Sequence, residues 1–474
     1  MKQRARVLIW LPATLVAWLG CARYHPKPIV PAQVESEFER RTFSAPGLRE
    51  YVETNLRAKP SEWPPHSLDL GMLTLVAFYY HPDLDVARAR AGVAEAGIRT
   101  AAARPNPVVG TGPGYEDFPA SPFLYRFTFD LPIETAGKRG YRIAQAQRLT
   151  DAARLDLAET AWQVRSRLRA ALLDYLLSSR ELGLLTEEEG LRSETVKLVQ
   201  TRLAVGQASR PTVDLARYSL SDTALAIRSA ERRVARGRVV LAGALGLPLS
   251  ALDGFTFVWP GLDTPPSEEV ITLGGLQRAG LLNRLDVRRA LAEYAADEAA
   301  LQLEVARQYP NIHLGPGYAL DDGLNKFIFV PGITLPIFNQ NQGPIAQAEA
   351  RREEAAARFL ALQARIINDT EKALTEYRAA LRETSDANAA LAIQEARASA
   401  ARQGLKVGQL DRLAVLDAGL MALGAQELRL QALRRTQQAL GELEDAVERP
   451  LASDLSLPEL PATAPRAVSG TEKQ

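Results

Sequence analysis

The chain of 474 residues has only one cysteine, Cys21, so no disulfide bond can form within it. Its four histidines are scattered and do not have the spacing of a zinc site: His25, His66, His81 and His313. The net charge is +1, which gives no basic field for nucleic acid. The sequence also has no glycine-rich phosphate loop after a strand and no nucleophile elbow. We therefore expect no enzymatic activity, cofactor, metal centre or nucleic-acid partner.

Long apolar runs are missing as well. The run at residues 7–19 is too short for the roughly 20 residues of a membrane-spanning helix. It follows Lys2, Arg4 and Arg6, a charged start that is typical of a secretory signal, so we predict a signal peptide at residues 1–20. Cys21 comes directly after it and resembles the acylated cysteine of a bacterial lipoprotein. The alternative is a chance cysteine in a discarded leader.

The chain contains a tandem duplication with a constant offset of 202 residues. Three of the repeated motifs are Ile143-Ala144-Gln145-Ala146 with Ile345-Ala346-Gln347-Ala348, Val205-Gly206-Gln207 with Val407-Gly408-Gln409, and Pro248-Leu249 with Pro450-Leu451. We place repeat 1 at residues 67–250, a linker at 251–269 and repeat 2 at 270–451. Residues 21–66 are rich in proline, which predicts an extended N-terminal segment. For residues 452–474 we predict a disordered tail.

Each repeat is predicted to contain two strands. In residues 123–131, apolar side chains alternate with polar ones, with Leu124 as the exception, which indicates a strand with two different faces. The apolar face has Phe123, Tyr125, Phe127, Phe129 and Leu131, and the polar face has Arg126, Thr128 and Asp130. Residues 309–319 and 326–335 match the two strands in repeat 2, although Ile328 and Val330 intrude on the polar face.

Such strands have two interpretations. In a soluble sandwich the aromatic face would pack on a second sheet. In an outer-membrane barrel it would face lipid, and a length of about 9–11 residues suits a tilted spanning strand. Four strands per chain cannot close a barrel, and open sheet edges are not tolerated in lipid, so a barrel requires several chains.

Long helices favour the barrel. No proline interrupts residues 145–204 or 346–406, and each run would extend about 90 Å if it were continuous, far beyond a compact domain. Turns at 205–211 and 407–412 send the chain back through helices predicted at 214–246 and 416–447. Two further helices are predicted at 68–80 and 83–103. Each repeat thus has two strands, a long helix, a turn and a returning helix.

Several motifs together resemble the TolC family of outer-membrane efflux proteins. They are Leu-Pro-Ile-Phe-Asn-Gln-Asn-Gln-Gly at 335–343, the tandem halves, the Val-Gly turns and the lipoprotein-like start. Residues 131–134 and 137–140 are most similar to the branch that serves heavy-metal efflux pumps. The resemblance covers residues 67–450. It implies a mainly α, lipid-anchored homotrimer in the bacterial outer membrane, with twelve strands in one transmembrane β-barrel and a periplasmic tunnel of long coiled-coil helices.

The resemblance also implies partners and site residues. The turns would meet a periplasmic adaptor (membrane fusion) protein and, through it, an inner-membrane pump of the resistance-nodulation-division type; they comprise Val205, Gly206, Gln207, Val407, Gly408 and Gln409. In this family, acidic residues shortly after the second Val-Gly turn ring the periplasmic aperture. Asp417 matches one by spacing, whereas the position three residues earlier is Ala414. Asp214 would add a second layer, and the nearest donors in sequence are Arg412 and Arg210. The alternative is a solvated aspartate on a helix face.

We therefore expect a passive trimeric exit duct of a tripartite efflux system for heavy-metal cations. Two alternatives remain open at this point. One is a duct of the same type for drug efflux or type I protein secretion. The other is an extracytoplasmic coiled-coil scaffold without a pore.

Overall fold

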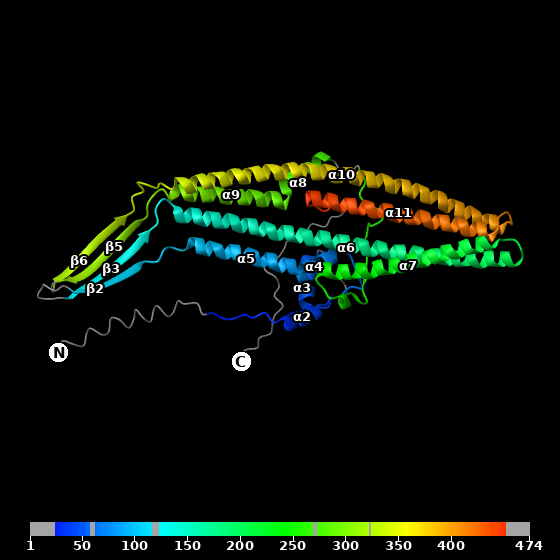
Figure 1. Cartoon of the computed structure of the whole chain (residues 1–474), viewed down its shortest axis with the longest axis horizontal. Coiled ribbons are helices and arrows are strands. Elements are labelled where there is room, and N and C mark those ends of the chain that lie inside the picture. Colours follow the sequence, from blue (N-terminus) through cyan, green and yellow to red (C-terminus); the bar gives the residue numbers. More distant parts are fainter. Residues whose placement is uncertain (1–23, 57–61, 116–122, 269–272, 322–323, 452–474) are drawn as a thin grey trace. The chain divides into compact units, whose positions relative to one another are not determined.

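A computed structural model describes residues 24–56, 62–115, 123–268, 273–321 and 324–451 (Figure 1). The predicted signal peptide, Cys21 and the C-terminal tail lie outside these residues. The chain divides into two units, Met1–Thr42 and Phe43–Gln474. The described part of the first unit contains one helix, α2 (Pro31–Glu39), which buries no side chain.

The N-terminal segment is helical where the sequence predicted an extended chain. It contains α2 and, at the start of the second unit, α3 (Pro46–Asn55), which buries Leu48, Tyr51 and Val52. Each helix has its proline in the first turn, where the missing N–H costs nothing and the fixed φ favours the helix. The prolines that indicated an extended segment therefore begin helices instead.

The second unit holds both repeats and is mainly helical, as predicted. Repeat 1 contains β1 (Ser67–Leu68), α4 (Leu70–Tyr80), α5 (Pro82–Ala102), β2 (Val108–Tyr115), β3 (Phe123–Ile133), α6 (Lys138–Ala204) and α7 (Arg210–Leu245). The end of repeat 1 and the start of the linker form η1 (Leu249–Leu252), and the linker contains β4 (Thr256–Phe257), which pairs with β1. Repeat 2 contains α8 (Leu273–Asn283), α9 (Leu285–Ala306), β5 (Ile312–Asp321), β6 (Leu324–Ile333), α10 (Gln342–Lys406) and α11 (Arg412–Val447). Sequence reasoning missed α8 and α9, the counterparts of α4 and α5.

Helix α6 is the centre of the second unit. Near the strands it packs against α5 and α9, and α9 packs on α10. Toward the turns it packs against α7 and α11, and α11 packs on α10. The order is therefore α5–α6–α9–α10 near the strands and α7–α6–α11–α10 near the turns. One flank is made by α5 and α7, and the other flank by α10. None of the helices in the described ranges is both long and apolar enough to cross a membrane.

The four longer strands form one antiparallel sheet in the order β2-β3-β5-β6, so that β2 and β6 are its edges. The register places Phe127 beside Tyr318, and Tyr318 beside Phe327, in one row on the aromatic face. The opposite face has Arg126, Thr128 and Asp130 on β3 and several glycines on β2 and β5. A Cβ added to Gly315 would lie 2.6 Å from the carbonyl oxygen of Val330, so only glycine fits there. The two different faces predicted for residues 123–131 are confirmed in β3, whereas Ile328 and Val330 of β6 lie on the polar face, beside Gly317 and Gly315.

The strand-to-helix links of both repeats converge on the end of α9. The Lys138 side chain, at the start of α6, donates to the carbonyl oxygen of Tyr309 (2.5 Å) and to Oδ1 of Asn311 (2.6 Å). In repeat 2, Asn341 precedes α10 and donates to the carbonyl oxygen of Glu304 at 2.8 Å. These contacts tie the end of α9 and the segment that leads from it into β5 to the starts of both long helices.

A charged cluster is buried between α6 and α11, where the repeats meet. One oxygen of Glu444 accepts from Arg165 (3.3 Å) and lies 3.4 Å from Nε of Arg169. The three side chains are 2–6% exposed. Arg169 also donates to the carbonyl oxygen of Gln437 at 2.9 Å. Burial lowers the pKa of Arg169, and the Glu444 carboxylate opposes that shift. A Cβ on Gly441 would overlap the Arg169 guanidinium, so this glycine makes the ion cluster sterically possible.

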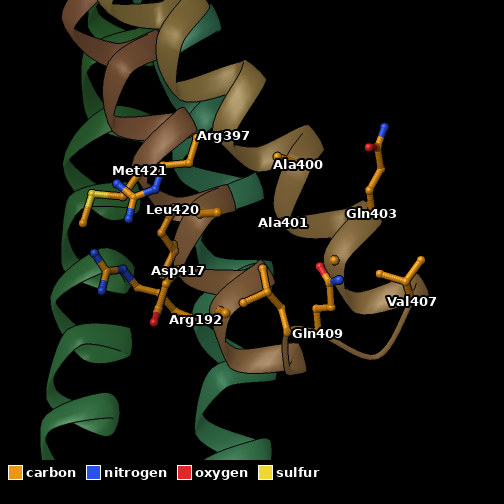
Figure 2. Close-up of a pocket in the computed structure, with 14 residues that line it drawn as sticks. Arg192, Arg397, Ala400, Ala401, Gln403, Val407, Gln409, Asp417, Leu420 and Met421 are labelled. Atoms are coloured by element: carbon orange, nitrogen blue, oxygen red, sulfur yellow. The ribbon is translucent and has the colours of Figure 1, made fainter.

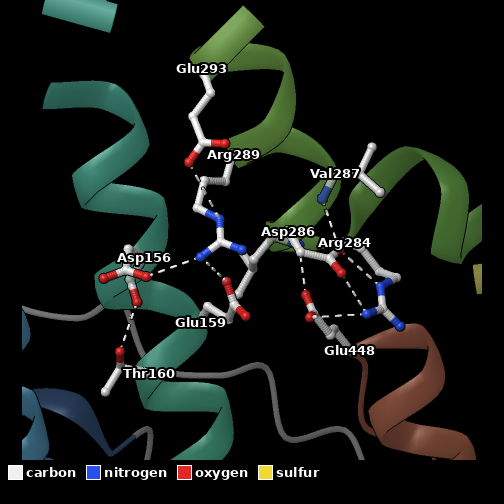
Figure 3. Close-up of polar contacts among 10 residues, drawn as sticks. Asp156, Glu159, Thr160, Arg284, Asp286, Val287, Arg289, Glu293 and Glu448 are labelled. Atoms are coloured by element: carbon white, nitrogen blue, oxygen red, sulfur yellow. Dashed lines mark hydrogen bonds and ion pairs between the residues drawn. The ribbon is translucent and has the colours of Figure 1, made fainter. Parts of the chain in front are cut away.

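Next to this cluster, the end of α11 and the start of α9 cap each other (Figure 3). The Glu448 carboxylate accepts from the N–H of Leu285 at 2.6 Å, while Arg284 donates to the carbonyl oxygen of Ala446 at 2.7 Å. An anion thus lies at a helix N-terminus and a cation at a helix C-terminus, as the helix dipoles favour. Burial raises the pKa of Glu448 to about 6. The pKa of Glu448 is therefore higher in the folded chain than its usual 4.5. The contribution of this carboxyl to the free energy of unfolding is fully present below pH 4.5 and is lost as the pH rises through about 6.

Candidate functional site at the helical turns

The two Val-Gly motifs form turns of the same conformation. Gly206 and Gly408 both have φ +75°. In each turn the glycine N–H donates to a carbonyl oxygen in the last turn of the preceding helix: Leu203 at 3.0 Å and Leu405 at 3.1 Å. The following glutamine N–H reaches one carbonyl further back, as in a helix-ending Schellman motif. The duplicated motif therefore reverses the chain in the same way twice.

Both turns present apolar side chains to solvent. Val205 is 65% exposed and Val407 is 69% exposed. A Cβ added to either turn glycine would meet nothing within 4 Å, so glycine is needed for its positive φ and not for space. Exposed valines beside a fixed backbone turn give a rigid apolar knob that a protein partner can cover.

Ion pairs connect the turn region of repeat 1 with that of repeat 2. Arg202, at the end of α6, lies 2.8 Å from Asp411, and Arg412 donates to both oxygens of Glu194 at 2.7 and 2.8 Å. Asp411 also caps α11 by accepting from the N–H of Ala414 at 2.8 Å. That N–H and then Arg202 lower the pKa of Asp411, and Arg412 lowers the pKa of Glu194. We call these contacts the turn ion pairs.

Asp417 lines a groove of about 1210 Å³ that begins at the second turn (Figure 2). Arg192 from α6, Arg397 from α10 and Met421 from α11 line the same groove, together with Val407 and Gln409. Asp417 is exposed and makes no hydrogen bond or ion pair with any residue in the described ranges. A carboxylate with two guanidinium groups along one groove suits either an aperture that closes by ion pairing or a polar partner.

The predicted donors to Asp417 are placed elsewhere. Arg412 binds Glu194, and Arg210 begins α7 beside the other turn. Asp214 is the fifth residue of α7; it is exposed and does not line the groove of Asp417. Arg192 and Arg397 are the basic residues that share that groove, and sequence spacing gave no indication of them because they lie on different helices.

The described residues contain no group of three or more histidine, cysteine, aspartate or glutamate side chains placed to hold a metal ion.

Comparison with known proteins matches each repeat separately. The family model described as outer membrane efflux protein matches residues 77–247 and 276–447. The cobalt-zinc-cadmium resistance protein CzcC of Cupriavidus metallidurans is 28% identical over 351 residues, which cover 73% of this chain and 81% of that protein.

Solved structures share the fold. The outer-membrane channel OprN matches with a TM-score of 0.66 and 18% identity, over 90% of this chain and 98% of that chain. The outer membrane protein VceC of Vibrio cholerae matches with a TM-score of 0.64 and 20% identity, over 80% of this chain and 95% of that chain. The TolC-like fold and the tandem organisation predicted from the sequence are confirmed.

The glycine of the second turn provides a test of the turn geometry. An L-residue in the left-handed region costs roughly 1–2 kcal/mol, so Gly408→Ala should speed amide hydrogen exchange at the turn by about 5- to 30-fold. Gly424→Ala is the matched control, because Gly424 lies on an exposed part of α11 with open space around it. There, alanine should stabilise the helix by about 0.5–1 kcal/mol. Equal exchange at residues 404–410 in both variants would contradict the assignment of strain to Gly408.

Proposed function

Because this chain belongs to the outer membrane efflux protein family, we propose that three copies of it form the passive exit duct of a tripartite heavy-metal efflux system. Membership in this family supports a channel in the outer membrane and argues against the alternative of a scaffold without a pore. The heavy-metal cargo is supported by the similarity to a cobalt-zinc-cadmium resistance protein. Energy would come from the pump, because a duct of this kind only conducts.

The main support for a duct built from several chains is that the second unit has two open flanks. One flank consists of β2, α5 and α7, and the other consists of β6 and α10. Strand edges leave backbone N–H and C=O groups unpaired and invite pairing with another chain. Because the two flanks differ, copies join head to tail, and such contacts close into a ring when the rotation fits. Three copies with four strands each would give the twelve-stranded barrel of the TolC family.

The two helical flanks carry apolar side chains at matching levels. Leu225 on α7 lies 19 residues after Gly206 and is 71% exposed. On α10, Ala389 lies 19 residues before Gly408, and the exposed Ile393 is one helical turn nearer to it. At about 1.5 Å per residue, Leu225 and Ala389 are at the same distance from their turns. Leu225 of one copy would therefore lie opposite Ala389 of the next, one helical turn from Ile393.

The two faces of the sheet suit the two sides of a barrel. The row of Phe127, Tyr318 and Phe327 would face lipid, and Thr128 with the glycines would face the interior. Small residues on the inner face leave the bore open, and the polar side chains there meet water. The helical tunnel would continue this bore through the periplasm to the turns.

The turns would meet the adaptor and, through it, a pump of the resistance-nodulation-division type. Val205 and Val407 supply exposed apolar contacts at the two turns of each copy. Three copies would present six such turns around the aperture. Asp417 would line that aperture, and Arg192 and Arg397 are the basic residues that line the same groove.

Metal export can be tested in a metal-sensitive host that carries the cognate adaptor and pump but lacks the channel. The wild-type chain should restore tolerance to zinc, cadmium or cobalt and lower the metal content of the cells. The double variant Val205→Glu, Val407→Glu should reach the outer membrane and fail to restore tolerance. Restored drug tolerance without metal tolerance would overturn the cargo assignment in favour of drug efflux.

Ring closure can be tested by cross-linking at one level of the duct. Leu225→Cys combined with Ala389→Cys should give covalent dimers and trimers with a short thiol cross-linker. The control combines Leu225→Cys with Leu428→Cys; Leu428 is exposed at a similar level, 20 residues after Gly408, but on α11. Equal cross-linking in both pairs, or none in the first, would argue against contact between α7 and α10 of neighbouring copies.

Lipid anchoring at Cys21 is a separate part of the proposal. The wild-type chain should incorporate labelled palmitate, whereas Cys21→Ala should not. The variant should still assemble, since the strands insert through their own apolar face. Equal labelling of both proteins would exclude Cys21 as the acceptor.

A further inference from the structure

A histidine and an aspartate meet on the inner, polar face of the sheet. His313 is the second residue of β5, and Asp130 lies near the end of β3. Nδ1 of His313 is 3.1 Å from both carboxylate oxygens of Asp130. A histidine whose first ring nitrogen is held by a carboxylate is the arrangement that orients metal-binding imidazoles in proteins.

The second ring nitrogen of this histidine is left for a ligand. When Nδ1 carries the proton and donates it to Asp130, Nε2 keeps its lone pair. Nε2 makes no hydrogen bond with the described residues, and the side chains of His313 and Asp130 are 41% and 48% exposed. The register places Pro132 and Gly332 on either side of His313, so neither neighbour offers a competing polar side chain.

The position of the pair in the fold gives it a place on the conduction path. The row that contains Ile312 is the last row of the sheet before the helices, and His313 lies one residue from it. In the proposed ring, three copies of His313 would lie at one level, where the helical tunnel opens into the barrel. Every ion that leaves the tunnel would pass this level.

We propose that His313, oriented by Asp130, is a transit ligand for the divalent cargo cation at the entrance of the barrel. This inference rests on the proposed function. Imidazole suits zinc, cobalt and related transition metals, whereas magnesium and calcium take oxygen ligands. The site therefore selects by ligand chemistry, whereas a carboxylate such as Asp417 attracts any divalent cation.

One imidazole per copy binds a hydrated cation weakly, and weak binding suits a conduit. An ion must enter readily and also leave readily, so a site that held the cargo with several ligands would slow its exit. Asp130 contributes through orientation and basicity and does not need to touch the ion. It is therefore a positioning residue.

A purely structural role is the competing explanation. The pairing of β3 with β5 is interrupted between Thr128–Gly317 and Leu131–Leu314, where Pro316 has no N–H to donate. The hydrogen bond between His313 and Asp130 crosses this interruption and holds the strands together. A structural role alone predicts a change in trimer stability and no change in the response to zinc.

Single-channel recording on the purified full-length trimer separates the two roles. Zinc added to the wild-type channel should reduce the current, whereas magnesium at the same concentration should leave the current unchanged. His313→Gln should abolish the zinc effect, measured as the fraction by which zinc reduces each channel's own zinc-free current. Asp130→Asn should weaken the zinc effect by about 10- to 100-fold, as losses of such orienting carboxylates do. Heat-modifiable migration of each variant checks that the trimer is intact.

Asp417→Ala is the matched comparison, because it removes an oxygen ligand at the other end of the duct. It should alter the response to magnesium and leave the difference between zinc and magnesium in place. Equal zinc block of wild type and His313→Gln, in intact trimers of normal conductance, would overturn the inference. Failure of the proposed function would instead appear in the metal-tolerance assay and does not depend on the block.

Discussion

The structure depends on the buried contact between α6 and α11. Two arginines of repeat 1, Arg165 and Arg169, share the Glu444 carboxylate of repeat 2 in a place almost closed to solvent. Removing one partner of such a buried group leaves an unpaired charge and typically costs about 3–5 kcal/mol. The ion cluster therefore allows one alignment of the two repeats. That alignment brings the turn ion pairs together further along the same two helices and sets the order of the flanks.

The alignment of the repeats is also what leaves the flanks open. With α6 and α11 at the centre, α7 and α10 are turned outward, and the sheet keeps the same order with β2 and β6 at its edges. A single chain thus contains a completely packed contact between its two repeats and two flanks that are open to other chains. Lys138 contacts the segment between α9 and β5, and Asn341 contacts the end of α9. Both interactions lie where the sheet joins the helices, so they connect the borders of the two layers.

The sequence predicted the features that depend on local pattern. A constant offset identified the duplication, alternation identified the two-faced strand, and the Val-Gly motifs identified both turns. Pairs that form across the repeats were not predictable, since no local pattern indicates them: Arg412 and Glu194 are 218 residues apart, and His313 and Asp130 are 183 residues apart. The N-terminal helices were missed because a proline in the first turn of a helix cannot be told by composition from a proline in an extended segment.

The matched lengths of the returning helices restrict how this molecule can change. Helices α7 and α11 both have 36 residues, and the turn ion pairs hold their starting points at one level. A deletion of seven residues from each of the two helices of one hairpin alone would withdraw its turn by about 10 Å and break those pairs. Insertions and deletions are therefore tolerated only when both halves of the gene acquire them together. The duplication binds the two halves to a shared length, and the reach of the duct can evolve only in paired steps.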